Sequence, residues 1–129
     1  MRSVSDVKET HSIKALVKSF KHAGRGILTS LVIGRNIKVH YTAAIAVVGG
    51  GLYFHVTKTE FLILLIAISQ VITLEMVNTA IENSIDLVTK DYHIHAKIAK
   101  DVAAGAVLIA AIIATIIGGI IFLPYILNQ

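Results

Sequence analysis

The C-terminal end of the chain is a long apolar run that contains no charged residue. From Val102 to Gln129 there is no Asp, Glu, Lys or Arg. A run of this length exceeds the ~20 residues that cross a bilayer as a helix. The whole chain is 55% hydrophobic and 16% charged, which is too apolar for a small soluble domain. We therefore expect an integral membrane protein.

Two further apolar segments precede this run, so the sequence predicts three transmembrane helices. Their expected bounds are about 37–56, 59–88 and 97–123, with Pro124 ending the third helix. The first segment is short and carries Gly49-Gly50-Gly51, glycines that either fray the helix or allow close contact with a neighbouring backbone. The expected fold is all-α, and residues 1–129 are expected to form one domain.

The region 1–33 is predicted to hold a surface helix. Between Ser12 and Leu31 apolar residues recur every three or four positions, and lysine, histidine and arginine fill much of the remainder. Ser12 is a plausible N-cap, and Gly34-Arg35-Asn36 breaks the helix. A basic polar face suits an anionic membrane surface. The alternative is a cytosolic helix packed on other protein.

The basic residues are distributed unequally around the predicted spans. Eight of the twelve lysines and arginines lie between Arg2 and Lys38, and Lys58 alone lies between the first two spans. Three more lie between the second and third spans, and the C-terminus has none. The positive-inside rule therefore predicts a cytoplasmic N-terminus and an outside C-terminus. It also explains the net charge of +4 without a nucleic-acid partner.

Polar groups gather on one face of the second span, in its inner half. At ~100° per residue they share about a quarter-turn of the helix: Glu75, Asn78, Thr79, Glu82 and Asp86. Each charge at membrane depth costs ~2.5–3.5 kcal/mol. Cations from Lys97 and Lys100, a bound divalent metal or water in a cavity must compensate.

Hard oxygen ligands beside a lysine suit Mg²⁺ that carries phosphate oxygens. The alternative is an ion-pair network that only holds helices together. The chain has no cysteine, no GxxxxGK[ST] loop, no protein-kinase motifs and no HExxH. His93 and His95 make a poor metal site and are predicted to be polar residues of a loop over Thr89–Ala96.

Two blocks carry a resemblance to a known family. They read Glu75-x-x-Asn78-Thr79-Ala80-Ile81-Glu82-x-x-x-Asp86 and Lys97-x-x-Lys100-Asp101-x-Ala103-Ala104-Gly105-Ala106-Val107. The segments Ser19–Gly26 and Arg35-Asn36-x-x-x-His40 belong to the same pattern. Together they resemble the prokaryotic diacylglycerol kinase family over about residues 15–123, and within it the undecaprenol kinase branch of Gram-positive bacteria.

The resemblance implies a homotrimeric lipid kinase of the bacterial plasma membrane. Such an enzyme moves the γ-phosphoryl of ATP, with Mg²⁺ as cofactor, onto a lipid hydroxyl at the cytoplasmic interface. Undecaprenol is the first candidate acceptor, and its product, undecaprenyl phosphate, recycles the carrier of cell-wall synthesis. Diacylglycerol, which gives phosphatidic acid, is the alternative. A transporter is disfavoured because its acidic residues should lie near the membrane midplane.

The resemblance also implies roles for single residues. Glu75 is the expected general base, Glu82 the expected metal ligand, and Asn78 and Asp86 are expected to support the site. The expected nucleotide-binding residues are His22, Glu82, Asp91, Tyr92, His93, Lys100 and Asp101. The expected lipid-substrate residues are Asn36, His40, Glu75 and Ala104.

One position departs from the family pattern. Gly34 stands where the family has a second metal-binding glutamate, just before Arg35-Asn36. Its loss is expected to weaken Mg²⁺ binding. Three readings stay open: a weakened kinase, a pseudokinase, and a site completed by another group such as Asp101.

Overall fold

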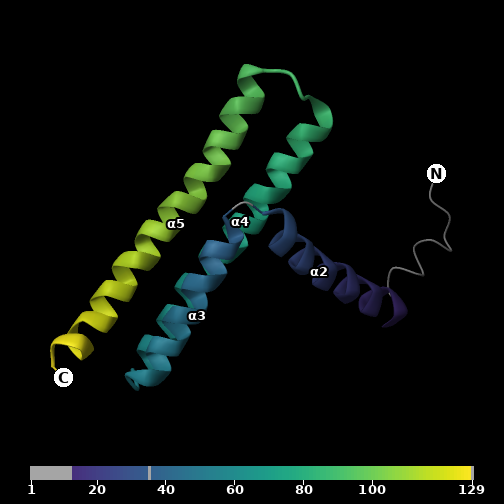
Figure 1. Cartoon of the computed structure of the whole chain (residues 1–129). Coiled ribbons are helices and arrows are strands. Elements are labelled where there is room, and N and C mark those ends of the chain that lie inside the picture. Colours follow the sequence, from purple (N-terminus) through teal and green to yellow (C-terminus); the bar gives the residue numbers. More distant parts are fainter. Residues whose placement is uncertain (1–12, 35, 129) are drawn as a thin grey trace. The chain divides into compact units, whose positions relative to one another are not determined.

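A computed structural model describes residues 13–34 and 36–128, and these residues form only helices and short connections (Figure 1). The helices are α2 (Ile13–Ile33), α3 (Ile37–Tyr53), α4 (Lys58–Val88) and α5 (Ile94–Leu127). The expected all-α fold is confirmed. The chain divides into two compact units between Ile33 and Gly34. One unit holds α2, and the other holds α3, α4 and α5.

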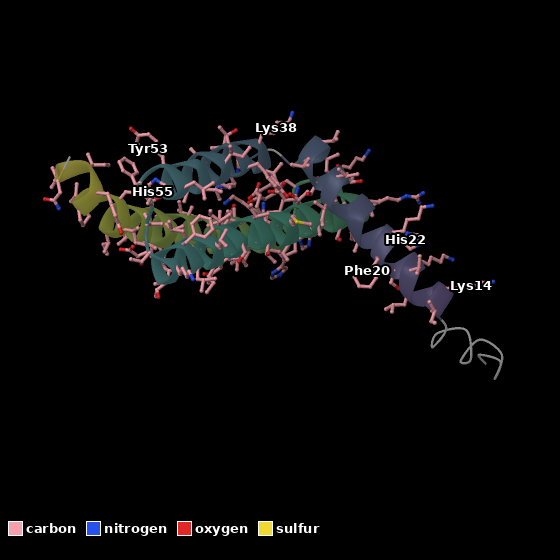
Figure 2. All side chains as sticks on the ribbon, turned by 90° about the horizontal axis from the view of Figure 1, so that it is seen from below. Lys14, Phe20, His22, Lys38, Tyr53 and His55 are labelled. Atoms are coloured by element: carbon pink, nitrogen blue, oxygen red, sulfur yellow. The ribbon has the colours of Figure 1, made fainter. Side chains whose placement is uncertain are left out.

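The helix α2 is amphipathic, as the spacing predicted. Its apolar side chains Leu16 and Phe20 are exposed, and Phe20 and His22 extend to different sides of the helix (Figure 2). An exposed apolar side opposite a basic one is typical of a helix on a membrane surface. The helix ends at Ile33, beside the predicted break. The predicted N-cap, Ser12, lies outside the described residues.

The second unit is built around α4, which packs against both α3 and α5. Its apolar core is formed by Ile37, Leu64, Ala67, Val71, Val107, Ala110 and Ile121. Large apolar side chains such as Ile66, Ile109 and Ile116 point outward and are exposed. Because lipid solvates such a surface, this unit has the surface of a membrane protein.

Two of the described helices, α4 and α5, are each long and apolar enough to cross a membrane. At 17 residues, α3 is shorter than the ~20 residues that a bilayer requires. The third predicted span therefore stays a prediction.

The start of α4 is defined by a reciprocal capping interaction. The Thr57 hydroxyl accepts a hydrogen bond from the Glu60 backbone N–H at 3.3 Å, and Glu60 Oε2 accepts one from the Thr57 backbone N–H at 2.8 Å. This capping box satisfies two backbone donors that a helix start leaves free. The helix consequently begins at Lys58, one residue before the predicted start.

The three glycines of α3 do not fray the helix, which continues through them to Tyr53. A Cβ atom at Gly51 would lie 3.1 Å from the Phe61 ring, so glycine at this position lets α3 approach α4 closely. The helix then closes with hydrogen bonds from His55 N to Leu52 O and from Val56 N to Gly51 O. His55 takes the left-handed position of this Schellman motif, with φ 51°. The predicted end near residue 56 was therefore three residues late.

Both predicted ends of α5 were wrong. The helix continues past Pro124 to Leu127, because a proline in the last turn removes one backbone hydrogen bond while its φ still suits a helix. The helix also begins at Ile94 instead of Lys97. His93 caps it, since its Nδ1 accepts a hydrogen bond from the His95 backbone N–H at 3.3 Å. His95 therefore lies in α5 and not in the predicted loop.

The turn beyond Pro124 brings Tyr125 to α4. The Tyr125 hydroxyl donates a hydrogen bond to Glu60 Oε2 at 2.8 Å. The Phe54 ring lies 6.1 Å from the Phe122 ring and 6.4 Å from the Tyr125 ring, measured between centroids. This aromatic group joins the end of α3 to the ends of α4 and α5.

We expect Tyr125→Phe to lower the melting temperature in detergent by a few degrees, because it removes the hydrogen bond to Glu60 and keeps the ring. Tyr53→Phe is the matched control, since Tyr53 is exposed and its hydroxyl makes no hydrogen bond within the described residues. Melting curves in one detergent measure both. Equal melting temperatures for the two variants would show that the Glu60 contact contributes nothing to stability.

Candidate active site

The buried face of α4 changes from apolar to polar along one helical stripe. Leu64, Ala67 and Val71 are followed on the same face by Glu75 and Asn78, at intervals of three or four residues. Glu75 is 2% exposed and Asn78 5%. The packing that buries three apolar residues thus also buries a carboxylate and an amide in the C-terminal half of the helix.

These two side chains line a pocket of about 420 Å³ between α3, α4 and α5. Its polar lining comes from Asn36, His40, Glu75, Asn78 and Glu82, and its apolar lining from Val39, Ala104, Val107, Leu108 and Ala111. All four residues assigned to the lipid substrate by resemblance line this pocket. The structure brings them together from three helices, and their roles stay predictions.

Two buried atoms of this pocket lack a hydrogen-bond partner among the described residues: Glu75 Oε2 and Asn78 Oδ1. The other end of the Asn78 amide is held, because its Nδ2 donates to Glu82 Oε1 at 3.2 Å. A buried polar atom without a partner costs about 1–3 kcal/mol. Native proteins rarely leave such atoms unsatisfied. The pocket is therefore suited to a ligand that supplies a hydrogen-bond donor or a cation.

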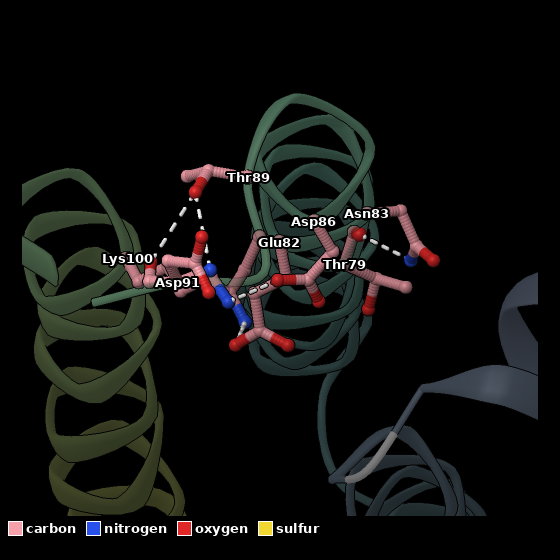
Figure 3. Close-up of polar contacts among 8 residues, drawn as sticks. Thr79, Glu82, Asn83, Asp86, Thr89, Asp91 and Lys100 are labelled. Carbon is pink, nitrogen blue, oxygen red and sulfur yellow. Dashed lines mark hydrogen bonds and ion pairs between the residues drawn. The ribbon is translucent and has the colours of Figure 1, made fainter. Parts of the chain in front are cut away.

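The C-terminal end of α4 and the N-terminal part of α5 are joined by an ion pair outside this pocket (Figure 3). Lys100 Nζ lies 2.5 Å from Asp86 Oδ1, and Lys97 Nζ lies 2.8 Å from Asp101 Oδ2 along α5. The compensation expected from the lysines is thus present for Asp86, but neither lysine reaches Glu75. All four side chains are at least one-third exposed, so these pairs contribute little to stability.

The remaining candidates for nucleotide binding are spread over three places. Asp91, Tyr92 and His93 lie in the connection between α4 and α5, where the Thr89 hydroxyl accepts a hydrogen bond from Asp91 N at 3.1 Å. His22 lies on α2, in the other unit. Of the seven expected residues, Glu82 alone lines the pocket.

The sequence reasoning missed the apolar lining of the pocket. Val39 precedes His40 on α3, while Val107, Leu108 and Ala111 follow Ala104 on α5. A signal was present, because Ala104, Val107 and Ala111 are spaced as one helical face. Without the structure, nothing distinguished this face from one that contacts lipid.

The oxygen atoms of the pocket meet only part of what Mg²⁺ requires. Within residues 13–34 and 36–128 no three histidine, aspartate or glutamate side chains gather as a metal cluster. The oxygens of Glu75, Asn78 and Glu82 are nevertheless hard ligands. Mg²⁺ is commonly held by one or two carboxylates together with phosphate oxygens and waters. The residues therefore fit a metal delivered with a phosphate better than a cage made only of protein.

Two residues bear on the missing carboxylate. Gly34 is buried and lies two residues before the pocket residue Asn36. Asp101, which was considered as a replacement ligand, does not line the pocket, and its side chain is 62% exposed beside Lys97. Within this chain, Asp101 is thus poorly placed to complete a metal site at Glu82.

Comparison with known proteins identifies similar sequences. The family model described as prokaryotic diacylglycerol kinase matches residues 21–122. The undecaprenol kinase of Bacillus subtilis is 44% identical over 114 residues, which cover 88% of this chain and 93% of that protein. A diacylglycerol kinase of a Synechocystis species is 40% identical over 114 residues, which cover 88% of this chain and 65% of that protein.

Proposed function

The chain belongs to the prokaryotic diacylglycerol kinase family, and we propose that it is an ATP-dependent lipid kinase whose acceptor is undecaprenol. The observation that carries the proposal is the buried Glu75 carboxylate, whose Oε2 has no partner among the described residues and lines a pocket shared by three helices. A lipid hydroxyl in the pocket would donate the hydrogen bond that Glu75 Oε2 lacks.

We propose that Glu75 accepts the proton of the lipid hydroxyl as that oxygen attacks the γ-phosphorus of ATP. The bond from the γ-phosphorus to the bridging oxygen then breaks, and ADP leaves. Phosphoryl transfer needs positioning and charge neutralisation more than covalent help from the protein. The surrounding apolar side chains exclude water, which would otherwise compete with the lipid hydroxyl for the phosphoryl group.

Mg²⁺ would be held by the carboxylate of Glu82 and by the Oδ1 atom of Asn78. The metal, when bound, neutralises charge on the phosphate oxygens. Within the chain itself, the hydrogen bond from Asn78 Nδ2 to Glu82 Oε1 fixes the orientation of both side chains. Asn78 Oδ1 has no hydrogen-bond partner among the described residues and is therefore available to a ligand. The residues proposed to contact the nucleotide are Lys100, Asp101, Asp91, Tyr92, His93 and His22.

The proposal also covers how the helices are arranged in the membrane and how many copies of the chain associate. Residues 1–129 are taken as one membrane-embedded kinase domain with α2 on the membrane surface and α3, α4 and α5 as spans. The unequal distribution of basic residues supports a cytoplasmic N-terminus. The family resemblance supports a homotrimer in the bacterial plasma membrane, which cross-linking in native membranes tests.

The identity of the acceptor is tested by competition. Purified protein in detergent micelles receives labelled MgATP and an equimolar mixture of undecaprenol and diacylglycerol. We expect labelled undecaprenyl phosphate to form faster than labelled phosphatidic acid, by roughly tenfold or more. The support is that the undecaprenol kinase relative is covered over 93% of its own length, and the diacylglycerol kinase relative over 65%. Faster labelling of phosphatidic acid would assign diacylglycerol as the acceptor instead.

A further inference from the structure

A second hollow continues from the Glu75 pocket toward the other end of the helices. Most of the residues that line it are apolar. Its volume is about 340 Å³, and we call it the apolar groove. His40 and Ala111 line both the pocket and the groove. On α4 the groove reaches Val71 and Ile72, and the next pocket residue along that helix is Glu75. The two hollows therefore adjoin on all three helices.

Small side chains make the space in this groove. Its small lining residues include Ala43, Ala44, Ala67, Ala114 and Gly118, and the larger Phe122 also lines it. Thr115 adds no free polar group, because its hydroxyl donates to Ala111 O at 2.8 Å. Apolar cavities stay dry and bind hydrocarbon. The chemistry of the groove thus suits a hydrocarbon chain.

Phe122 is the lining residue of α5 that lies farthest along the helix from Ala111. Its ring lies 3.4 Å from the position of a Cβ atom at Gly50 and 6.1 Å from the Phe54 ring. The Phe122 ring therefore lies close to Gly50 of α3 and to the Phe54 ring.

The dimensions decide what the groove can hold. From Ala111 to Phe122 the helix rises roughly 16 Å at ~1.5 Å per residue. Spread over that length, 340 Å³ leaves a cross-section on the order of 20 Å². That admits one extended hydrocarbon chain. A helix of a second copy is about 10 Å wide and does not fit.

The length of chain follows from the volume. A cavity of about 150 Å³ accommodates benzene. By the same measure, the groove takes roughly 14 carbon atoms, close to three isoprene units.

We propose that this groove binds the hydroxyl-proximal end of a single-chain polyprenol, over about three isoprene units, and so positions its hydroxyl at Glu75. The proposal rests on the proposed kinase function and specifies the part of the lipid that the protein recognises. The remainder of a long polyprenol stays in the bilayer, where it contributes no discrimination.

Two neighbouring glycines offer a matched test. Gly118 lines the groove, whereas Gly119 is exposed, and a Cβ atom at either position meets nothing within 4 Å. Gly118→Leu should fill the groove without a clash, and Gly119→Leu should place the same side chain in lipid. Any general effect of a leucine on the helix appears in both variants.

The first measurement is the KM for linear prenols of increasing length, with the full-length protein in detergent micelles. For the wild type and Gly119→Leu we expect KM to fall over about three isoprene units and then to level off. For Gly118→Leu it should level off after about two, because Ala111 to Gly118 spans roughly 10 Å. The KM for undecaprenol should rise roughly fivefold to tenfold in that variant only. A KM independent of chain length, or equal in both leucine variants, would overturn the proposal.

The second measurement does not depend on kinase activity. A prenol with a photoreactive diazirine on its third isoprene unit is cross-linked to the protein, and the labelled residues are mapped by mass spectrometry. We expect label between Gly118 and Phe122 in the wild type and its loss in Gly118→Leu. If label maps there while no phosphate is transferred, the kinase proposal fails and the groove assignment stands. Label spread over the exposed faces of α5, or a change of oligomer size in Gly118→Leu, would refute the groove assignment.

Discussion

Glu75→Gln is expected to lower kcat for lipid phosphorylation by roughly 10²–10⁴, the usual contribution of a positioned general base. Glutamine keeps the shape of the side chain and its hydrogen-bonding capacity, but the amide does not take up the proton of the lipid hydroxyl. The KM for ATP should change little, because Glu75 is assigned to the acceptor. Transfer of labelled phosphate from MgATP to undecaprenol in micelles measures the rate.

The fold of this variant can be tested separately. Glu75 is buried, and a neutral amide is less costly to bury than a carboxylate. The melting temperature of Glu75→Gln should therefore equal or exceed that of the wild type. Glu60→Gln is a control on the same helix, since Glu60 lies in the capping box at the other end of α4. It should lower the melting temperature and leave kcat unchanged. Wild-type kcat in Glu75→Gln would exclude Glu75 as the base.

Gly34→Glu is expected to restore the family's second metal-binding carboxylate. The Mg²⁺ concentration for half-maximal activity should fall by roughly 10–100-fold, the size of effect seen when a supporting group at a metal site is changed. The physical reason is that Glu82 and Asn78 supply few ligands for a divalent cation, and a second carboxylate adds both a ligand and a charge. A Mg²⁺ titration of the phosphorylation rate gives the shift.

Binding of Mn²⁺, followed by electron paramagnetic resonance, measures the same change without turnover. Gly34→Gln is the matched control, because glutamine has the size of glutamate without its charge and should give no gain in affinity. If Gly34→Glu binds Mn²⁺ more tightly and the wild type is inactive, the natural chain is a pseudokinase with an otherwise intact site. An unchanged Mn²⁺ affinity would contradict the assignment of Gly34 to the metal site.

Local sequence signals predicted the helices well where local contacts form them. The observed start of α4 lies one residue from the predicted one, and it is set locally, because Thr57 and Glu60 are three positions apart and cap the helix by themselves. The end of α5 was missed because Pro124 was expected to end the helix, although a proline in the last turn is compatible with it. Beyond Pro124, Tyr125 bonds to Glu60, a residue on another helix. The end of α3 was missed because glycine usually occupies the left-handed position that His55 takes here.

The candidate site was only partly accessible to sequence reasoning. Helical periodicity put Glu75 and Asn78 on one face, and both are buried on the packed face of α4. It did not separate Asp86 from them, although Asp86 is exposed and paired with Lys100. A spacing of four residues preserves the face of a helix, but the depth of a residue depends on where the neighbouring helix begins.

By itself the sequence determined that the chain is helical and apolar, and that acidic residues form a stripe in the C-terminal half of the second apolar segment. Only the tertiary structure decided that His40 of α3 and Ala104 of α5 share a pocket with Glu75, and that an apolar groove continues from it. Hydropathy and periodicity are properties of residues a few positions apart. A pocket depends on the distance between helices, and no single helix encodes that distance. Close contacts between helices, such as that of Gly51 with Phe61, set it.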